Sequence, residues 1–143
     1  MRLAIVLFLS VCLFACHDIN ELYVHPNCPE WVYGEVEMVL VELSDKCGED
    51  FESRLIGISD EVDSYMDVIV CGTDTIPKCS GWASESGDIW IDDTCSDGFT
   101  RWAIRHELGH YLGADDISGE NLMNHVRQTS QYTDVDIEEI CGE

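Results

Sequence analysis

Two histidines and a glutamate in this chain have the spacing of a motif that binds a metal ion and activates a water molecule with it. Residues 106–110 read His-Glu-Leu-Gly-His, so His106 and His110 would project from one face of a helix, one turn apart. Two imidazoles at that spacing can hold one zinc ion, and Glu107 beside them can reach a metal-activated water. On this composition the pattern arises by chance in roughly two of a hundred chains, so alone it is weak support for a metal site.

Two further residues extend the pattern to HExxHxxGxxD, with Gly113 and Asp116 at the specified positions. Their presence lowers the chance figure roughly a hundredfold. Glycine permits the sharp, often left-handed turn that ends a helix, which would carry the chain back beneath the metal. Asp116 can then be the third protein ligand and leave the fourth position to water, as in catalytic zinc sites. Asp115 competes for this role, but the motif spacing favours Asp116.

The hydrophobic pattern predicts the elements that would position this motif. Helical periodicity predicts helices over 30–46 and 97–112, and a last helix from about residue 133, with Asp136 placed for a capping box. Apolar runs predict five strands, at 22–25, 54–58, 66–71, 81–84 and 88–92. This order, with no internal repeat, predicts one α+β domain with a single mixed sheet.

The segment from His106 to Asp116, HELGHYLGADD, resembles the long zinc motif of the metzincin metallopeptidases. Aspartate replaces the more common third histidine, as in snapalysin-like members, and the overall likeness is to small matrixin-, snapalysin- and astacin-like domains. Residues 121–124 resemble the clan's methionine turn, which implies that Met123 lies beneath the zinc. The resemblance extends over nearly all of residues 19–141, but outside the zinc motif and the turn it is only topological.

The resemblance implies a fold and a division of the chain. The fold is a metzincin-like mixed, twisted sheet with two main helices, followed by a short subdomain that carries the methionine turn and a final helix. Residues 16–143 would form a single catalytic domain, with an N-terminal subdomain at 17–113 and a C-terminal one at 114–143.

The resemblance also implies an activity, that of a zinc-dependent endopeptidase. One catalytic Zn²⁺ would be held by His106, His110 and Asp116, and Glu107 would act as general base on the metal-activated water. The substrate would be a peptide or protein and the enzyme a monomer. Alternatives are a catalytically idle metzincin-like module used for binding or inhibition, and a disulfide-stapled structural lipoprotein with an accidental zinc motif.

Substrate binding and oxyanion stabilisation are the remaining parts that the resemblance addresses. The segment Gly81, Trp82, Ala83 and Ser84 resembles the clan's upper edge strand, on which an extended peptide can pair by β-augmentation. Some metzincins place a tyrosine two residues after the turn methionine to help stabilise the oxyanion. Here that position is His125, so no tyrosine is assigned to the role, and a surface or turn histidine is the favoured interpretation.

Composition limits the classes of partner. The chain has 143 residues, with 29 Asp and Glu against 7 Lys and Arg, for a net charge of −22. That charge would repel nucleic acid and anionic membrane surfaces, so no nucleic-acid partner is expected. The 45% of hydrophobic residues is too high for a disordered acidic tail. The acidity fits a preference for cationic substrates, but equally solubility or a salty habitat.

The N-terminus predicts export. Residues 1–15 form a short apolar run after Arg2, too short to span a bilayer and typical of a signal peptide. Leu13-Phe14-Ala15-Cys16 resembles a bacterial lipobox, so cleavage before Cys16 would leave a lipid-modified cysteine that anchors the protein to a membrane. The expected location is therefore the bacterial cell envelope, with plain secretion as the alternative.

The eight cysteines are expected to form disulfides more than to bind metal. Cys12 leaves with the signal peptide and Cys16 would carry lipid, which leaves six, with no CxxC pair and 15 connectivities. Similarity to astacin-like metzincins implies two pairs and leaves a third: Cys47–Cys141, Cys79–Cys95 and Cys28–Cys71.

Several other residues invite functional interpretations that compete with plain structural ones. Asp92, Asp93 and Asp97 form an oxygen-rich cluster that could hold Ca²⁺, but a solvated acidic rim or a helix cap is favoured. His17 and His25 are far from the motif and are expected not to be ligands. Four tryptophans occupy apolar positions and are predicted to be core, namely Trp31, Trp82, Trp90 and Trp102.

Overall fold

In the part of the chain that the structure describes, five strands and three α-helices follow one another in the order that the sequence predicts. The structure is a computed structural model, and it describes residues 21–60, 66–72, 79–84, 87–120, 122–124 and 129–142. The elements are β1 (Glu21–Val24), α1 (Glu30–Cys47), a 3₁₀ turn (Glu52–Arg54), β2 (Leu55–Ile58), β3 (Met66–Cys71), β4 (Gly81–Ala83), β5 (Ile89–Ile91), α2 (Asp97–Tyr111) and α3 (Asp134–Cys141). Each predicted end lies within one residue of the observed one. Residues 1–15, Cys16, His17 and His125 lie outside the described residues.

The strands form one mixed sheet in the order β2-β1-β3-β5-β4. Neighbouring strands run parallel except β4, which is antiparallel to β5 and pairs Gly81 with Ile91, Trp82 with Trp90 and Ala83 with Ile89. The expectation of an α+β domain with a mixed sheet is confirmed. Within the described residues β4 pairs with a strand on one side only, so its other side is an edge of the sheet.

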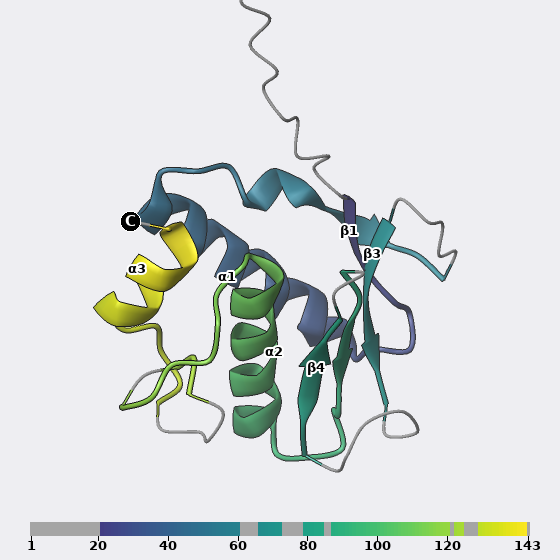
Figure 1. Cartoon of the computed structure of the whole chain (residues 1–143). Helices are drawn as coiled ribbons and strands as arrows, with labels where there is room; N and C mark the ends of the chain where they lie inside the picture. Colours follow the sequence, from purple (N-terminus) through teal and green to yellow (C-terminus); the bar gives the residue numbers. More distant parts are fainter. Residues whose placement is uncertain are drawn as a thin grey trace, which may run out of the picture.

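Helices α1 and α2 lie beside each other against the sheet, and α3 packs against both of them (Figure 1). Every second residue of the strands faces these helices, as the side-chain alternation of a strand requires. The apolar stripe of α1 meets them, with Val32, Val36, Val39, Leu40 and Leu43 all fully buried. Burying each such side chain contributes about 1.5–3 kcal/mol, so this interface holds α1 to the sheet.

A buried ion-pair cluster joins α1 to α2. Glu35 on α1 is 3% exposed. Its carboxylate accepts a hydrogen bond from Arg101 and forms an ion pair with Arg105, both on α2. Arg105 Nη1 also lies 2.9 Å from Glu42 Oε2. Removing one partner of such a buried cluster would leave an uncompensated charge, at a cost of about 3–5 kcal/mol. The cluster therefore sets the position of α2 along α1.

Among the described residues, three disulfides tie the chain at widely separated points. They are the two pairs that the resemblance implied and the third pair that these two leave. Cys28–Cys71 links the loop after β1 to the end of β3, and Cys47–Cys141 links the ends of α1 and α3. Cys79–Cys95 links the approach to β4 with the loop before α2. The Cys47–Cys141 bridge joins residues 94 positions apart. A bridge that closes a loop of that size lowers the conformational entropy of the unfolded chain, which stabilises the fold by about 4–5 kcal/mol.

The tryptophans do not share one environment. Trp102 is 6% exposed and belongs to the core, whereas Trp31 and Trp90 are half-buried. The prediction that Trp82 is core is wrong, because its side chain is 55% exposed. It lies on an edge strand and projects from the sheet face opposite to α2. Among the described residues, no helix combines the length and apolarity needed to cross a membrane.

Candidate metal centre

Three potential ligand atoms meet at the C-terminal half of α2. The Nε2 atoms of His106 and His110 are 3.1 Å apart, and Asp116 Oδ1 lies 3.3 Å from each of them. Among the described residues this is one of two groups in which three such atoms lie within 4.8 Å of one another. The structure therefore brings together the three residues that the motif predicted as ligands.

The size of this triangle suits a zinc ion. Four ligands at about 2.0–2.1 Å in tetrahedral geometry stand about 3.3–3.4 Å from one another, close to the distances found here. The unprotonated nitrogens also face one another. His106 Nδ1 donates to the carbonyl of Leu122 at 3.0 Å, and His110 Nδ1 donates to that of Ala114 at 2.8 Å. A carbonyl can only accept, so each Nε2 lone pair is directed at the other ring, an arrangement that a cation between them would stabilise.

Burial favours the ligand form of the first histidine. His106 is 5% exposed, and its burial, together with repulsion from His110, lowers the pKa of its imidazole. The hydrogen bond to Leu122 opposes this shift only in part. Since a metal binds the neutral ring, the site is prepared for a ligand role without prior loss of a proton near neutral pH.

Gly113 ends α2 in the way that the third ligand requires. Its φ is +105°, and its N–H bonds the carbonyl of His110 while the Ala114 N–H bonds that of Gly109. These two bonds form a Schellman motif, in which glycine is strongly preferred. The motif reverses the chain, and the same reversed segment supplies the Ala114 carbonyl to His110 and the carboxylate of Asp116. The predicted glycine turn is therefore present.

The turn at 122–124 lies beneath the two histidines. Met123 is fully buried and packs against Gly109, where an added Cβ would come within 2.3 Å of its sulfur. Asp136 of α3 holds this turn, because its carboxylate accepts the N–H groups of Leu122 at 3.0 Å and Met123 at 2.8 Å. The sequence indicated Asp136 only as the capping-box residue of Thr133, a role that it also fills. No local sequence pattern indicated that the carboxylate of Asp136 would also bind the 122–124 turn.

Glu107 lies against the edge strand. Its side chain is buried, and an added Cβ on Gly81 would come within 2.7 Å of its Cγ, so β4 rests directly on it. The loss of hydration on burial raises the pKa of Glu107 to about 7, while His110 and a hydrogen bond from the Ala83 backbone amide act in the opposite direction. A carboxyl group with this pKa can both accept and release a proton near neutral pH.

A cleft of about 800 Å³ opens over these residues. One side is formed by residues 79–84, which include β4, and the other by α2 and residues 113–116. The aromatic rings of Phe99 and Trp102 line its interior, and the Trp102 ring stacks on His106 with centroids 5.0 Å apart. The Trp102 Nε1–H is buried and has no hydrogen-bond acceptor among the described residues. The cleft thus combines apolar walls with a small set of convergent polar groups, as ligand sites do.

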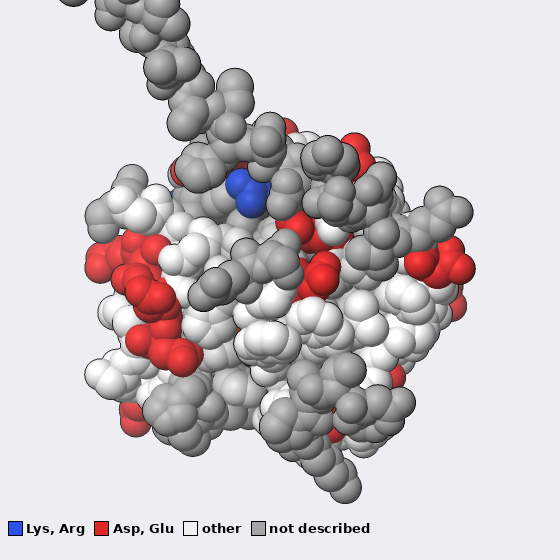
Figure 2. Space-filling model, turned by 45° about the vertical axis from the view of Figure 1, so that its right-hand side comes forward, with Lys and Arg blue, Asp and Glu red and all other residues white. Residues whose placement is uncertain are grey.

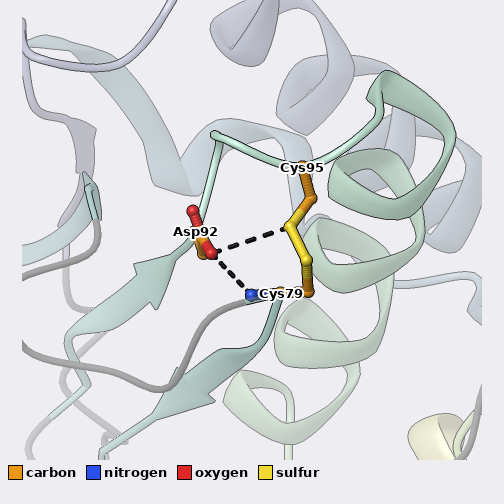
Figure 3. A group of neighbouring side chains, drawn as sticks. All are labelled: Cys79, Asp92 and Cys95. Atoms are coloured by element: carbon orange, nitrogen blue, oxygen red, sulfur yellow. Dashed lines mark hydrogen bonds between the residues drawn. A yellow bond between two sulfur atoms is a disulfide. The ribbon is translucent and has the colours of Figure 1, made fainter.

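The second group of potential ligand atoms consists of Cys79, Asp92 and Cys95 (Figure 3). The two cysteines form a disulfide, and Asp92 points at it from the end of β5, with Oδ2 3.7 Å from Cys95 Sγ. Its carboxylate accepts the N–H of Cys79 at 2.5 Å and the N–H and hydroxyl of Thr94. Asp92 therefore fastens the approach to β4 to the segment that leads into α2.

One interpretation of the acidic residues is corrected by this arrangement. Asp92 is fully buried, so it is not part of a solvated rim. In the described part of the chain Asp92, Asp93 and Asp97 are not gathered as a ligand group. Asp97 lies in the first turn of α2, where the helix dipole stabilises its negative charge. The N-cap is Ser96, whose side chain accepts the N–H of Phe99.

The remaining predicted residues have simple placements. Asp115 is exposed and is not in the ligand triangle. His25 follows β1, and its Nδ1 accepts the N–H of Asn27. Ser84 follows β4, and its N–H donates to the carbonyl of Asp88 at 2.8 Å.

No protein-family model matches this chain, and no curated protein sequence matches it. What the centre does must therefore follow from its own geometry and chemistry.

Proposed function

We propose that the chain is a zinc-dependent endopeptidase of the metzincin type. One observation carries the proposal: a ligand triangle of two histidines and an aspartate stands beside a buried carboxylate, Glu107, in an open cleft next to a sheet edge. Each part of this arrangement has a use in peptide-bond hydrolysis. A structural metal site would instead be closed by a fourth protein ligand, and it would have no need of a general base.

In this proposal His106, His110 and Asp116 hold the zinc. When bound, zinc would polarise the scissile carbonyl and make water a better nucleophile. Glu107 takes the proton from the attacking water and passes it to the leaving amine. Burial raises the pKa of this carboxyl group, which makes it a stronger base, and a hydrogen bond from the Ala83 N–H holds it against β4.

The edge of β4 offers a way to hold an extended peptide. Ser80 and Ser84 direct their backbone groups to β5, since the Ser80 carbonyl accepts the N–H of Asp92 and the Ser84 N–H donates to Asp88. The backbone groups of Gly81 and Ala83 therefore point away from β5. The Ala83 N–H donates to Glu107, so the groups offered to a peptide are the Gly81 N–H and carbonyl and the Ala83 carbonyl. A peptide strand pairing there would run along the cleft beside Glu107, with main-chain hydrogen bonds supplying affinity.

We also propose that the protein acts as a monomer outside the cytoplasm and is anchored by lipid at Cys16. Three disulfides support an oxidising compartment. In a bacterial host a Cys16→Ala variant should move from the membrane fraction to the soluble fraction. An unchanged distribution would contradict the lipid anchor.

The proposed activity is tested on purified protein with its disulfides formed. We expect one zinc per chain, cleavage of casein or a peptide library, and a loss of at least about a hundredfold in kcat/KM for Glu107→Gln with zinc retained. Glu37→Gln, an exposed change on α1, is the matched control and should be unaffected. Zinc without any cleavage would favour an idle binding module, and a protein without zinc would favour a structural lipoprotein.

A further inference from the structure

Trp82 presents a large aromatic ring to solvent at the edge of the cleft. Its side chain is 55% exposed, and one face of its indole stacks on Trp90 with ring centroids 5.2 Å apart and planes at 19°. The two residues are direct cross-strand partners of β4 and β5. The stacked pair forms a continuous aromatic surface at this edge of the sheet, and the outer face of Trp82 leaves it open to a partner.

Strand geometry determines what would meet this ring. Gly81 faces Glu107, so Trp82, the next residue, projects from the opposite face of the sheet. A peptide strand added to the outer edge of β4 would place one residue opposite Trp82 on that same face. Its Cβ would lie about 4.5–5.5 Å from that of Trp82, which continues the row that Trp90 and Trp82 begin.

Charge favours a cation at that position. The chain carries a net charge of −22, and the basic residues that line the ion-pair cluster, Arg101 and Arg105, are held by Glu35 and Glu42. Among the described residues, no lysine or arginine lines the cleft. Among the described residues in the view of Figure 2, acidic groups occur in several places and basic groups in one small area. The field there attracts positively charged partners.

Arginine has the geometry to use both features. Its planar guanidinium stacks on an indole face, and such contacts are strongest with tryptophan. The protein itself contains this contact, since the guanidinium of Arg101 lies 4.7 Å from the centre of the Trp31 ring. The outer face of Trp82 offers the same surface to a side chain of another molecule.

We infer that Trp82 is a specificity-determining residue that selects peptides with an arginine at the position paired opposite it. The inference rests on the proposed use of β4 as a peptide-binding edge. It narrows the substrate class to basic polypeptides bound in an extended form.

The test measures binding without cleavage. Zinc-loaded Glu107→Gln protein is titrated with fluorescein-labelled ten-residue peptides in which a single arginine is moved along a neutral host and compared with citrulline, its uncharged isostere. Measurements at 0.5 M NaCl screen the long-range field and leave the stacking contact. At one position we expect arginine to bind about two- to fivefold more tightly than citrulline.

Variants at residue 82 then test whether the Trp82 ring causes the preference for arginine. Trp82→Leu should bring the arginine-to-citrulline ratio close to one, and Trp82→Phe should retain an intermediate ratio because it keeps a ring. Ile58→Ala is the matched control, since Ile58 is 59% exposed on β2, the opposite edge of the same sheet. It should leave the ratio unchanged.

Three results would overturn the inference: a ratio that Trp82→Leu does not alter, no preferred position, or a dimer in solution that Trp82→Leu dissociates. Each can occur while the wild-type protein still cleaves peptides, in which case the proposed function stands without this specificity. Conversely, an arginine preference that depends on Trp82 in a protein that cleaves nothing would support the binding site and refute the peptidase.

Discussion

Replacing Gly81 by alanine should displace Glu107, the proposed general base, without touching the proposed metal ligands. The new Cβ would lie 2.7 Å from Glu107 Cγ and 2.8 Å from Oε1, whereas ordinary contacts begin at 3.4 Å. The carboxylate must therefore retreat by about 0.7 Å, because β4 is held by its ladder to β5 and by the Cys79–Cys95 bridge. A displacement of this order commonly costs about ten- to a hundredfold in rate, since proton transfer depends on close approach.

The assay compares kcat/KM for peptide cleavage, zinc content and thermal stability in Gly81→Ala and Gly57→Ala. Gly57 is the matched control, because it lies in β2 at the other edge of the sheet and an added Cβ there meets nothing within 4 Å. We expect Gly81→Ala alone to lose activity, with zinc and melting temperature near the wild-type values. A Gly81→Ala protein as active as Gly57→Ala would refute the close contact between β4 and the base.

Three other predictions concern the support of the centre. Asp136→Asn should weaken zinc binding by about ten- to a hundredfold in a competition assay, because the carboxylate that holds the Leu122–Met123 turn is lost; unchanged affinity would contradict this. Gly109→Ala and Met123→Ala should be less than additive in denaturant unfolding, since the second change makes room for the first; simple additivity would count against their contact. Zinc should leave below about pH 5, because His106 then gains a proton despite the burial that lowers its pKa; zinc and full activity retained at pH 4.5 would disprove it.

Much of the fold was predictable because the patterns that encode it are local. The stripe of Val32, Val36 and Val39 recurs at helical spacing, and the same residues are buried in α1. The strand at 66–71 and the capping box of Thr133 and Asp136 were likewise encoded within a few residues. Such features need no knowledge of what packs against them.

The candidate centre was predictable to the same degree. His106 and His110 share a helix face because of their spacing alone, and Gly113 forms the expected turn because few other residues tolerate its φ of +105°. The exposed side chain of Trp82 was not predictable. A residue on an apolar strand pattern is buried or exposed according to where its strand lies in the sheet, and the order β2-β1-β3-β5-β4 is not written in any one segment.

By itself, then, the sequence determined the elements and pointed to the candidate ligand residues and the proposed general base, since each depends on neighbours in the chain. The tertiary structure decided the contacts between distant segments: Ala83 with Glu107, Asp136 with the 122–124 turn, and Cys79 with Asp92. It also decided the cysteine pairing, for which the residues alone left 15 possibilities. The physical reason is that hydrogen bonds and bridges across the fold depend on three-dimensional proximity, and only packing brings residues 13 to 94 positions apart into contact.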